Sequence, residues 1–170
     1  HALALQQRGV SVKAIDVSPL SCEAMRRRGI ADVECINLFD PRLGGGFDTI
    51  LMLMNGTGIA GKMSGLGGLL RRVASLLALG GQILIDSSDL SYVYQDEDGG
   101  MDIDLSGKYY GEVDYQMRYD RVEGLPFDWL YVDYPLLSAA AREAGLDCRL
   151  VAEGDHYDYL AQLSLERANP

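Results

Sequence analysis

Cysteine and histidine, the residues that build most disulfide frameworks and zinc sites, are scarce in this sequence. Its 170 residues include three cysteines, Cys22, Cys35 and Cys148, and two histidines, His1 and His156. The cysteines are odd in number and form no CxxC pair, and the histidines stand far apart. We therefore expect no metal site and no disulfide framework, and free thiols fit a reducing, cytoplasmic location best.

Positive charge and long apolar runs are also lacking. The chain carries 15 Lys and Arg against 25 Asp and Glu, which gives a net charge of −10. Because phosphate contacts dominate the affinity of proteins for nucleic acids, this balance argues against a DNA- or RNA-binding protein. No apolar stretch approaches the roughly 20 residues that cross a bilayer, so we expect no membrane association.

Glycine and apolar residues, by contrast, are plentiful. The chain has 20 glycines, and 48% of its residues are hydrophobic. This composition can build a buried core with many tight turns, and the length suits one domain, residues 1–170. Residues 1–8 have the pattern of a helix that ends at Gly9, with no initiator Met and no N-cap before it. We therefore expect an N-terminally truncated chain.

The first half of the chain alternates between strands and helices. Apolar strands are predicted at residues 10–17, 33–38, 47–54 and 82–86, and helices at 20–28 and 66–77. Ser18 is the expected N-cap of the first of these helices, and Gly80-Gly81 the end of the second. The continuous apolar strand at 47–54 is of the kind that is buried on both faces. Alternation at this spacing predicts a parallel α/β sheet.

The C-terminal third changes character. Its predicted elements are two tyrosine-rich strands at 108–122 and 127–134, a helix at 135–144, and two strands at 148–153 and 157–166. The tyrosine-rich strands predict an antiparallel hairpin inserted within residues 91–134, and the last two strands are too closely connected for anything but a second hairpin. The expected architecture is therefore α/β: a mostly parallel sheet, closed by an antiparallel C-terminal hairpin and carrying an inserted β-hairpin.

Asp16 stands at the end of the strand predicted at residues 10–17, where doubly wound folds bind their ligands. An acid at this position accepts hydrogen bonds from the ribose hydroxyls of a nucleotide cofactor. Alternatively, Asp16 only caps the following helix together with Ser18. Position alone leaves both interpretations open.

As a whole, these features resemble the class I S-adenosylmethionine-dependent methyltransferases, a Rossmann-like family. The resemblance rests on VKAIDVSP (12–19), FDTILMLMNG (47–56), LGGQILIDSS (79–88) and the closing hairpin. It implies that S-adenosyl-L-methionine is the cofactor. It also implies that the methyl group passes to a nitrogen, oxygen or carbon atom of an unidentified acceptor, which we expect to be a small molecule.

The resemblance also implies contacts with the cofactor at Asp16, Val17, Asn37, Leu38, Met54, Asn55 and Gly56. In this interpretation, Asp16 holds both ribose hydroxyls and Val17 lies beside the adenine. Asn37, followed by Leu38, stands where the family usually has an Asp that contacts the adenine amino group. Residues 54–56 line the methionine part of the cofactor and the transfer site.

The family's glycine-rich first loop, and the strand that leads into it, have no counterpart in these residues. This first strand is therefore missing from the expected sheet, which leaves either a gap or a direct pairing of strands 10–17 and 47–54. Because that loop holds the amino-acid end of the cofactor in the family, we expect these 170 residues alone to bind S-adenosylmethionine weakly or not at all.

The inserted hairpin is expected to cover the ligand-facing edge of the sheet, because an insertion after strand 82–86 emerges there. Ser87, Tyr92 and Tyr131 are the candidate acceptor-binding residues. The acidic segment 95–104 is expected to act as a lid that favours a neutral or cationic acceptor. Two alternatives stay open: residues 86–89 form only a polar loop, and the hairpin packs on a neighbouring subunit in a homodimer.

Two other functions compete with a methyltransferase. A fragment of an NAD-type dehydrogenase shares the acid-ended strand, although the closing hairpin argues against it. A catalytically degenerate Rossmann-like domain, kept for binding or assembly, is the second alternative. No residue is identified as a general base, and His156, in the turn of the last hairpin, is expected at the surface.

Overall fold

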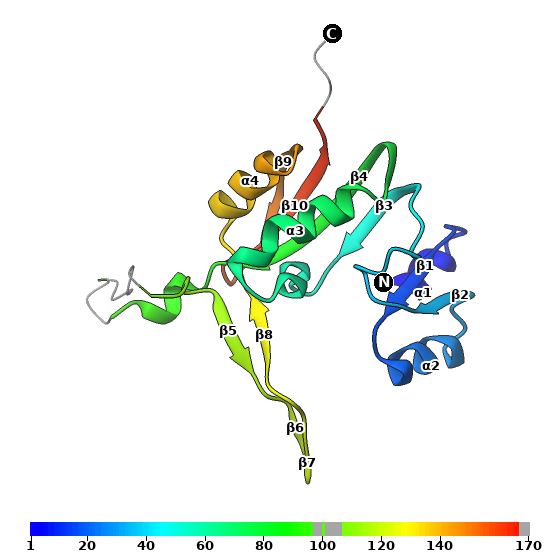
Figure 1. Ribbon diagram of the computed structural model, residues 1–170, viewed down its shortest axis with the longest axis horizontal. Coiled ribbons are helices and arrows are strands. Elements are labelled where there is room, and N and C mark those ends of the chain that lie inside the picture. The colour runs from blue at the N-terminus through cyan, green and yellow to red at the C-terminus, as the bar shows by residue number, and fades with distance from the viewer. Residues whose placement is uncertain (97–99, 101–106, 167–170) are drawn as a thin grey trace. The chain divides into compact units, whose positions relative to one another are not determined.

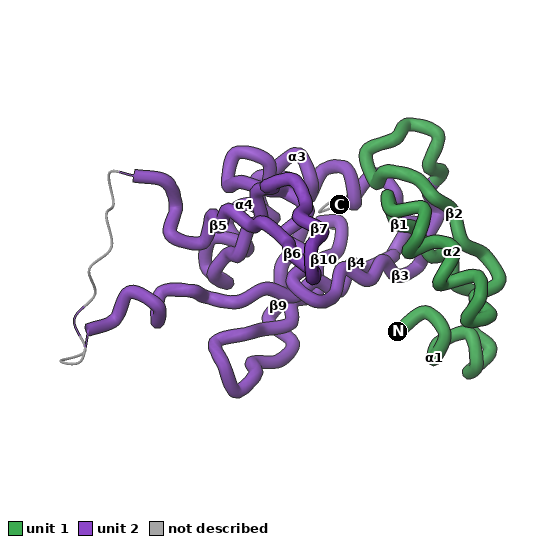
Figure 2. The backbone as a smooth tube through the Cα atoms, turned by 90° about the horizontal axis from the view of Figure 1, so that it is seen from below, with its two compact units in different colours: residues 1–44 green, residues 45–170 purple. Residues whose placement is uncertain are grey.

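The chain folds into two compact units, His1–Gly44 and Gly45–Pro170 (Figure 2). The structure is a computed structural model and describes residues 1–96, 100 and 107–166. The first unit contains α1 (Ala2–Gln6), β1 (Lys13–Asp16), α2 (Pro19–Arg27) and β2 (Asp32–Cys35). Strands β1 and β2 pair in parallel over four residues, so both are shorter than the predicted segments. Ser18 caps α2 as predicted, because its Oγ accepts a hydrogen bond from the Ser21 N–H at 3.3 Å.

The second unit holds the larger sheet (Figure 1). Its elements are β3 (Phe47–Met52), η1 (Gly56–Ala60), α3 (Met63–Ala74), β4 (Leu77–Ser88), η2 (Leu90–Tyr94), β5 (Glu112–Tyr115), β6 (Arg118–Tyr119), β7 (Val122–Glu123), β8 (Phe127–Leu130), α4 (Tyr134–Glu143), β9 (Leu146–Glu153) and β10 (Asp158–Leu165). The strand order is β3-β4-β10-β9, with β3 and β4 parallel and the other two pairings antiparallel. The predicted α/β class and the closing antiparallel hairpin are confirmed.

The core of this unit lies between α3, α4 and one face of the sheet. Residues at helical spacing on α3 are fully buried, namely Leu66, Leu69, Leu70 and Val73. Alternate residues of the strands face them: Ile83 and Ile85 on β4, and Ala161 and Leu163 on β10, all with no exposed surface. Helix α3 packs on β4 and α4 packs on β9 (Figure 1). The two periods, 3.6 for the helix and 2 for the strands, are those that the sequence pattern predicts.

Two boundaries of the sheet differ from the prediction. Helix α3 ends at Ala74, and β4 begins at Leu77, so Gly80 and Gly81 lie inside a strand rather than at a helix end. The β3–β4 register shifts here, and a Cβ atom on Gly81 would come within 2.8 Å of the Phe47 carbonyl oxygen. The glycines therefore allow a bulge and a close approach of two backbones, because no side chain has to fit between them.

Strand β3 is also less buried than predicted. The segment 47–54 was expected to be covered on both faces, yet β3 ends at Met52 and Leu51 is 38% exposed. Successive residues of a strand point to opposite faces, and Met52 is buried while Leu51 is exposed. Within the described residues, only one face of this edge strand is covered, which corrects the expectation.

The inserted hairpin is present as predicted. Strand β5 pairs antiparallel with β8, and the shorter β6 and β7 pair beyond them. Part of the acidic segment 95–104 predicted as a lid, namely residues 97–99 and 101–106, lies outside the described residues. In the part of the chain that the structure describes, no helix is long and apolar enough to cross a membrane, and no three His, Cys, Asp or Glu side chains gather where they could hold a metal ion.

Candidate functional site

The carboxyl end of β1 presents Asp16 in a half-buried position. Its Oδ1 accepts a hydrogen bond from the Ser18 N–H at 2.7 Å, and its carbonyl oxygen accepts one from the Ile36 N–H at 3.0 Å. Within the described residues, the second carboxylate oxygen, Oδ2, has no partner. Asp16 therefore supports the start of α2, as the capping interpretation predicts, and keeps one oxygen that can accept hydrogen bonds from a ligand.

The neighbouring candidates lie on the surface of the same unit. The Val17 side chain is 65% exposed, which leaves an apolar surface beside Asp16. The exposed Asn37 uses its Oδ1 to accept a hydrogen bond from the Phe39 N–H at 2.8 Å, and Leu38 is partly buried. An amide oxygen has two lone pairs, so Asn37 retains one acceptor site, and its amide NH₂ group has no hydrogen-bond partner within residues 1–96, 100 and 107–166.

The loop after β3 has an unusual backbone. Met54 and Asn55 have φ values of 67° and 62°, in the left-handed region that non-glycine residues rarely adopt. The N–H groups of Met54, Asn55 and Gly56 all donate to the Asp86 carboxylate, at 3.0, 2.7 and 3.2 Å. Each such residue costs on the order of 1–3 kcal/mol, and the charge-assisted hydrogen bonds offset that cost.

Asp86 was not singled out from the sequence as the group that holds this loop. Its segment, residues 86–89, was expected to be a polar loop or a substrate contact, but residues 86–88 belong to β4. The strand is longer than predicted because Asp158, Tyr159 and Leu160 of β10 pair with these polar residues. The one sequence signal for this role of Asp86 is an acid at the end of an apolar strand, and Asp16 has the same signal.

Ser87 lies in a buried network of hydroxyl and amide groups. Its side chain is 2% exposed and donates to Asn55 Oδ1 at 2.7 Å, lies 2.7 Å from Thr57 Oγ1, and accepts from the Val132 N–H at 3.0 Å. The Asn55 amide in turn donates to the Leu130 carbonyl oxygen at 3.1 Å. The network therefore joins the loop after β3 to the end of β8, and the predicted contact residue Ser87 faces the interior.

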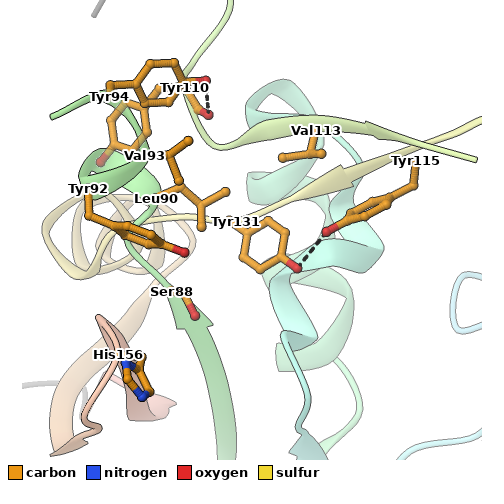
Figure 3. Close-up of a pocket in the computed structure, with 10 residues that line it drawn as sticks. All are labelled: Ser88, Leu90, Tyr92, Val93, Tyr94, Tyr110, Val113, Tyr115, Tyr131 and His156. Carbon is orange, nitrogen blue, oxygen red and sulfur yellow. Dashed lines mark hydrogen bonds between the residues drawn. The ribbon is translucent and has the colours of Figure 1, made fainter. Parts of the chain in front are cut away.

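A pocket of about 490 Å³ is lined in part by Ser88 and Tyr131, which directly follow Ser87 and Leu130 of this network in the sequence (Figure 3). It is lined by Ser88, Leu90, Tyr92, Val93, Tyr94, Tyr110, Val113, Tyr115, Tyr131 and His156. These residues come from the end of β4, from η2, from the inserted hairpin and from the β9–β10 turn, as Figure 3 shows. Of the three residues predicted to bind the acceptor, Tyr92 and Tyr131 line this pocket and Ser87 does not, whereas its neighbour Ser88 does.

Five of the ten residues that line the pocket are tyrosines. Burial, and then the hydrogen bond with Tyr115, raises the pKa of Tyr131 to about 12. The two hydroxyls lie 3.1 Å apart (Figure 3). Burial, and then the neighbouring Tyr109 and Asp89, raises the pKa of Tyr110 well above its ordinary value. Both phenols therefore stay neutral near pH 7, and they offer hydroxyl groups without charge.

Two carboxylates anchor the hairpin beside the pocket. The Tyr110 hydroxyl lies 2.9 Å from Asp89 Oδ1 and 3.1 Å from Asp133 Oδ2, and the Tyr109 hydroxyl donates to Asp133 at 2.7 Å. Asp89 is also the N-cap of η2, and Asp133 is the N-cap of α4. The start of the hairpin is therefore tied to two other elements, whereas Tyr119 near its tip is 86% exposed.

Comparison with solved structures shows what this chain is similar to. A SAM-dependent methyltransferase from Bacteroides fragilis, solved in complex with S-adenosyl-L-homocysteine, is 51% identical over 97% of this chain and 67% of that chain, with a TM-score of 0.89.

More distant matches share the fold. A S-adenosylmethionine-dependent methyltransferase from Clostridium acetobutylicum is 15% identical over 92% of this chain and 75% of that one, with a TM-score of 0.62. The CcbJ methyltransferase from Streptomyces caelestis is 13% identical over 98% of this chain and 79% of that one, with a TM-score of 0.69. No protein-family model and no curated protein matches the sequence.

Proposed function

Because the chain belongs to the class I S-adenosylmethionine-dependent methyltransferases and takes S-adenosylmethionine as its cofactor, we propose that the pocket of Figure 3 binds a small-molecule methyl acceptor. The observation that carries this proposal is the pocket itself. Its volume of about 490 Å³ is in the range of small-molecule sites, and its wall combines aromatic faces with a few polar tips. The comparisons give no support to the NAD-type dehydrogenase alternative.

We propose that the cofactor is held by the residues that the family resemblance indicates. Asp16 has an oxygen free for ribose hydroxyls, and the exposed Val17 offers an apolar surface for the adenine, with Asn37 and Leu38 beside them. When bound, the cofactor supplies an activated methyl group, so the protein contributes mainly positioning and exclusion of water.

The loop of residues 54–56 contributes differently from what its sequence implies. The exposed Met54 side chain, with 80% of its surface accessible, can contact the cofactor or the acceptor. Asn55 and Gly56 already give their N–H groups to Asp86, and the Asn55 side chain is bonded to Ser87 and Leu130. We propose that these two residues shape the transfer site rather than donate hydrogen bonds to a ligand, and that Ser87 positions them.

The acceptor is proposed to be neutral or cationic, with an apolar body and a polar nucleophilic group. The ten lining residues include no Lys or Arg that could neutralise a carboxylate or phosphate. Phenol rings present their negative π faces to a cation and their hydroxyls to a polar group. Tyr92 and Tyr131 are the proposed contacts, because both line the pocket and came from the sequence as candidates.

The number of domains, the cellular location and the oligomeric state are also proposed. The Bacteroides fragilis enzyme aligns with 97% of the chain, which supports one methyltransferase domain across residues 1–170. Three free cysteines fit a reducing cytoplasm. A homodimer formed through the hairpin stays a prediction that size-exclusion chromatography with light scattering can test.

The proposal is tested in a version of the chain that carries the family's glycine-rich first loop, with a panel of small acceptors in three classes: amines, alcohols and carboxylates, each with an aromatic or aliphatic body. Formation of S-adenosylhomocysteine is the readout. We expect turnover with amines or alcohols, and a rise in acceptor KM of about tenfold in Tyr92→Ala. The control is Tyr119→Ala, which removes an exposed tyrosine of β6 that does not line the pocket. Turnover of carboxylates alone, or an unchanged KM in Tyr92→Ala, would contradict the proposal.

A further inference from the structure

We propose that His156 is the catalytic base of this enzyme: its imidazole accepts the proton that the methyl acceptor loses. The inference rests on the proposed acceptor pocket, which His156 lines together with Ser88 and Tyr92 (Figure 3). His156 is exposed in the turn of the last hairpin, as the sequence predicts, and this turn also forms part of the pocket wall.

The backbone on both sides of His156 is held in place. The His156 N–H donates to Asp158 Oδ1 at 3.2 Å, and the Gly154 N–H donates to the Asp158 carbonyl oxygen at 2.7 Å. On the other side, the Tyr157 carbonyl oxygen accepts from the Asp89 N–H at 2.9 Å. The turn is therefore bonded to itself and to the start of η2, which is the element that forms much of the pocket.

Tyr157 adds a second, independent constraint. Its φ is 61°, in the left-handed region where a bulky residue is a true outlier. Its ring stacks on Tyr92 with centroids 4.7 Å apart and planes 12° from parallel. Strain at a non-glycine residue persists only where the surroundings enforce it, and it gathers at functional sites. Here the strained residue follows His156 directly and joins its turn to a pocket residue.

The other lining groups cannot take this role. The phenols of Tyr110 and Tyr131 stay protonated at neutral pH for the reasons given above, and phenols in general give up their proton only in alkaline solution. The Ser88 hydroxyl is not basic, and the remaining lining residues besides the tyrosines are apolar. Imidazole is the side chain that exchanges a proton between pH 5 and 8, so His156 is the suitable proton acceptor among the ten residues that line the pocket.

The ionisable groups around His156 come from three parts of the chain, and most of them form hydrogen bonds. From η2 they are Tyr92, Tyr94 and the N-cap Asp89; from the hairpin and the segment after β8 they are Tyr110, Tyr115 and Tyr131; and from the turn itself they are Asp155, Tyr157 and Asp158. Asp89 accepts from the Ser91 N–H and the Tyr110 hydroxyl, and Asp158 accepts from the His156 N–H. The pocket lining contains five tyrosines and no Lys or Arg, so His156 is the one nitrogen base among the ten lining residues.

The proposed step conserves atoms and charge. The acceptor's nitrogen or oxygen forms a bond to the methyl carbon, the carbon–sulfur bond breaks with its electron pair left on sulfur, and S-adenosylhomocysteine departs. The proton that leaves the acceptor passes to the imidazole, which returns it to water after product release. General-base catalysis of this kind contributes about 10²- to 10⁴-fold to a rate.

The test compares His156→Gln with the unchanged protein across pH 5.5–9, using the acceptor identified by the panel. We expect kcat to fall at least about 100-fold in the variant, and the loss of activity toward acid that accompanies imidazole protonation to disappear. Binding of S-adenosylmethionine, measured by calorimetry, and the melting temperature should stay close to those of the unchanged protein. Histidine proton resonances give a second readout: the signal missing in His156→Gln should shift when acceptor is added to the unchanged protein.

The outcomes separate this inference from the function it rests on. If Tyr92→Ala raises the acceptor KM, but His156→Gln keeps the original kcat and the loss of activity toward acid, the pocket binds the acceptor and His156 is not the base. If neither variant changes the kinetics, the acceptor lies elsewhere and both proposals fail. A resonance of His156 that ignores the acceptor would also overturn the inference.

Discussion

Two aspartates each end an apolar stretch of a strand: Asp16 is the last residue of β1, and Asp86 lies near the end of β4. They have different roles. Asp86 receives three backbone N–H groups from residues 54–56, so both its oxygens serve the fold. Asp16 receives one, from Ser18, and keeps an oxygen without a partner among the described residues. A carboxylate that is saturated by backbone donors is structural, whereas one with spare acceptor capacity can bind a ligand.

The same contrast separates two adjacent serines. Ser87 is buried and bonded to three groups from other segments, while Ser88 lines the pocket. Alternation along β4 puts the two side chains on opposite faces, so Ser87 enters the buried network and Ser88 faces the pocket. Assigning a role to either serine therefore requires knowledge of which face is covered.

The largest effect that tests this comparison is expected for Asp86→Ala. The substitution leaves three donors without their acceptor and two left-handed residues without support. We expect a loss of about 3–5 kcal/mol in the free energy of unfolding, measured by urea denaturation. Asp48→Ala, which removes an exposed acid from β3, is the matched control and should change stability little. Equal stability of the two variants would show that Asp86 does not hold the loop.

Asp16→Ala is expected to act on the cofactor rather than on the fold. In a longer version of the chain that carries the family's glycine-rich first loop, loss of hydrogen bonds to a charged group should weaken binding of S-adenosylmethionine by about 10- to 150-fold, which corresponds to about 1.5–3 kcal/mol. Calorimetry measures this change. Asp16→Asn keeps an oxygen for the Ser18 N–H and separates capping from ligand binding. An unchanged affinity in Asp16→Ala would mean that the residue is only a helix cap.

A smaller effect should distinguish the two serines. Ser87→Ala leaves the buried Val132 N–H without its acceptor and should lower the free energy of unfolding by about 1–2 kcal/mol. Ser88→Ala should leave stability nearly unchanged and alter the acceptor KM instead. Thermal and urea unfolding of both variants provide the comparison. The opposite result, with Ser88→Ala the less stable variant, would reverse the assignment.

The smallest effect concerns alkaline pH. Because the pKa of Tyr131 is raised from an ordinary value of about 10 to about 12, the folded state holds this proton when the unfolded chain has lost it. Stability contributed by the neutral phenol is therefore present below pH 10 and is lost as the pH rises toward 12. Tyr131→Phe should show a shallower decline of unfolding free energy over that range, whereas Tyr119→Phe should behave like the unchanged protein.

The alternation of strands and helices could be predicted from the sequence because it depends on local signals. Apolar spacing along α3, the Ser18 cap and the positive φ of Gly9 and Gly145 are read within a few residues of the chain. The start of β4 was predicted wrongly, because Leu76, Leu77 and Leu79 suit a helix end or a strand equally well. The pairing of Leu77 with Phe47 of β3 selects the strand.

By itself, the sequence determined the fold class, the closing hairpin, the family and two tyrosines, Tyr92 and Tyr131, that line the pocket of Figure 3. The tertiary structure alone decided which polar groups support the fold and which face a ligand. Asp86 meets its partners across about 30 residues of chain, Ser87 meets Val132 across 45, and His156 joins a pocket built by β4, η2 and the hairpin. Such contacts depend on the packing of distant segments, and no local pattern of residue types records them.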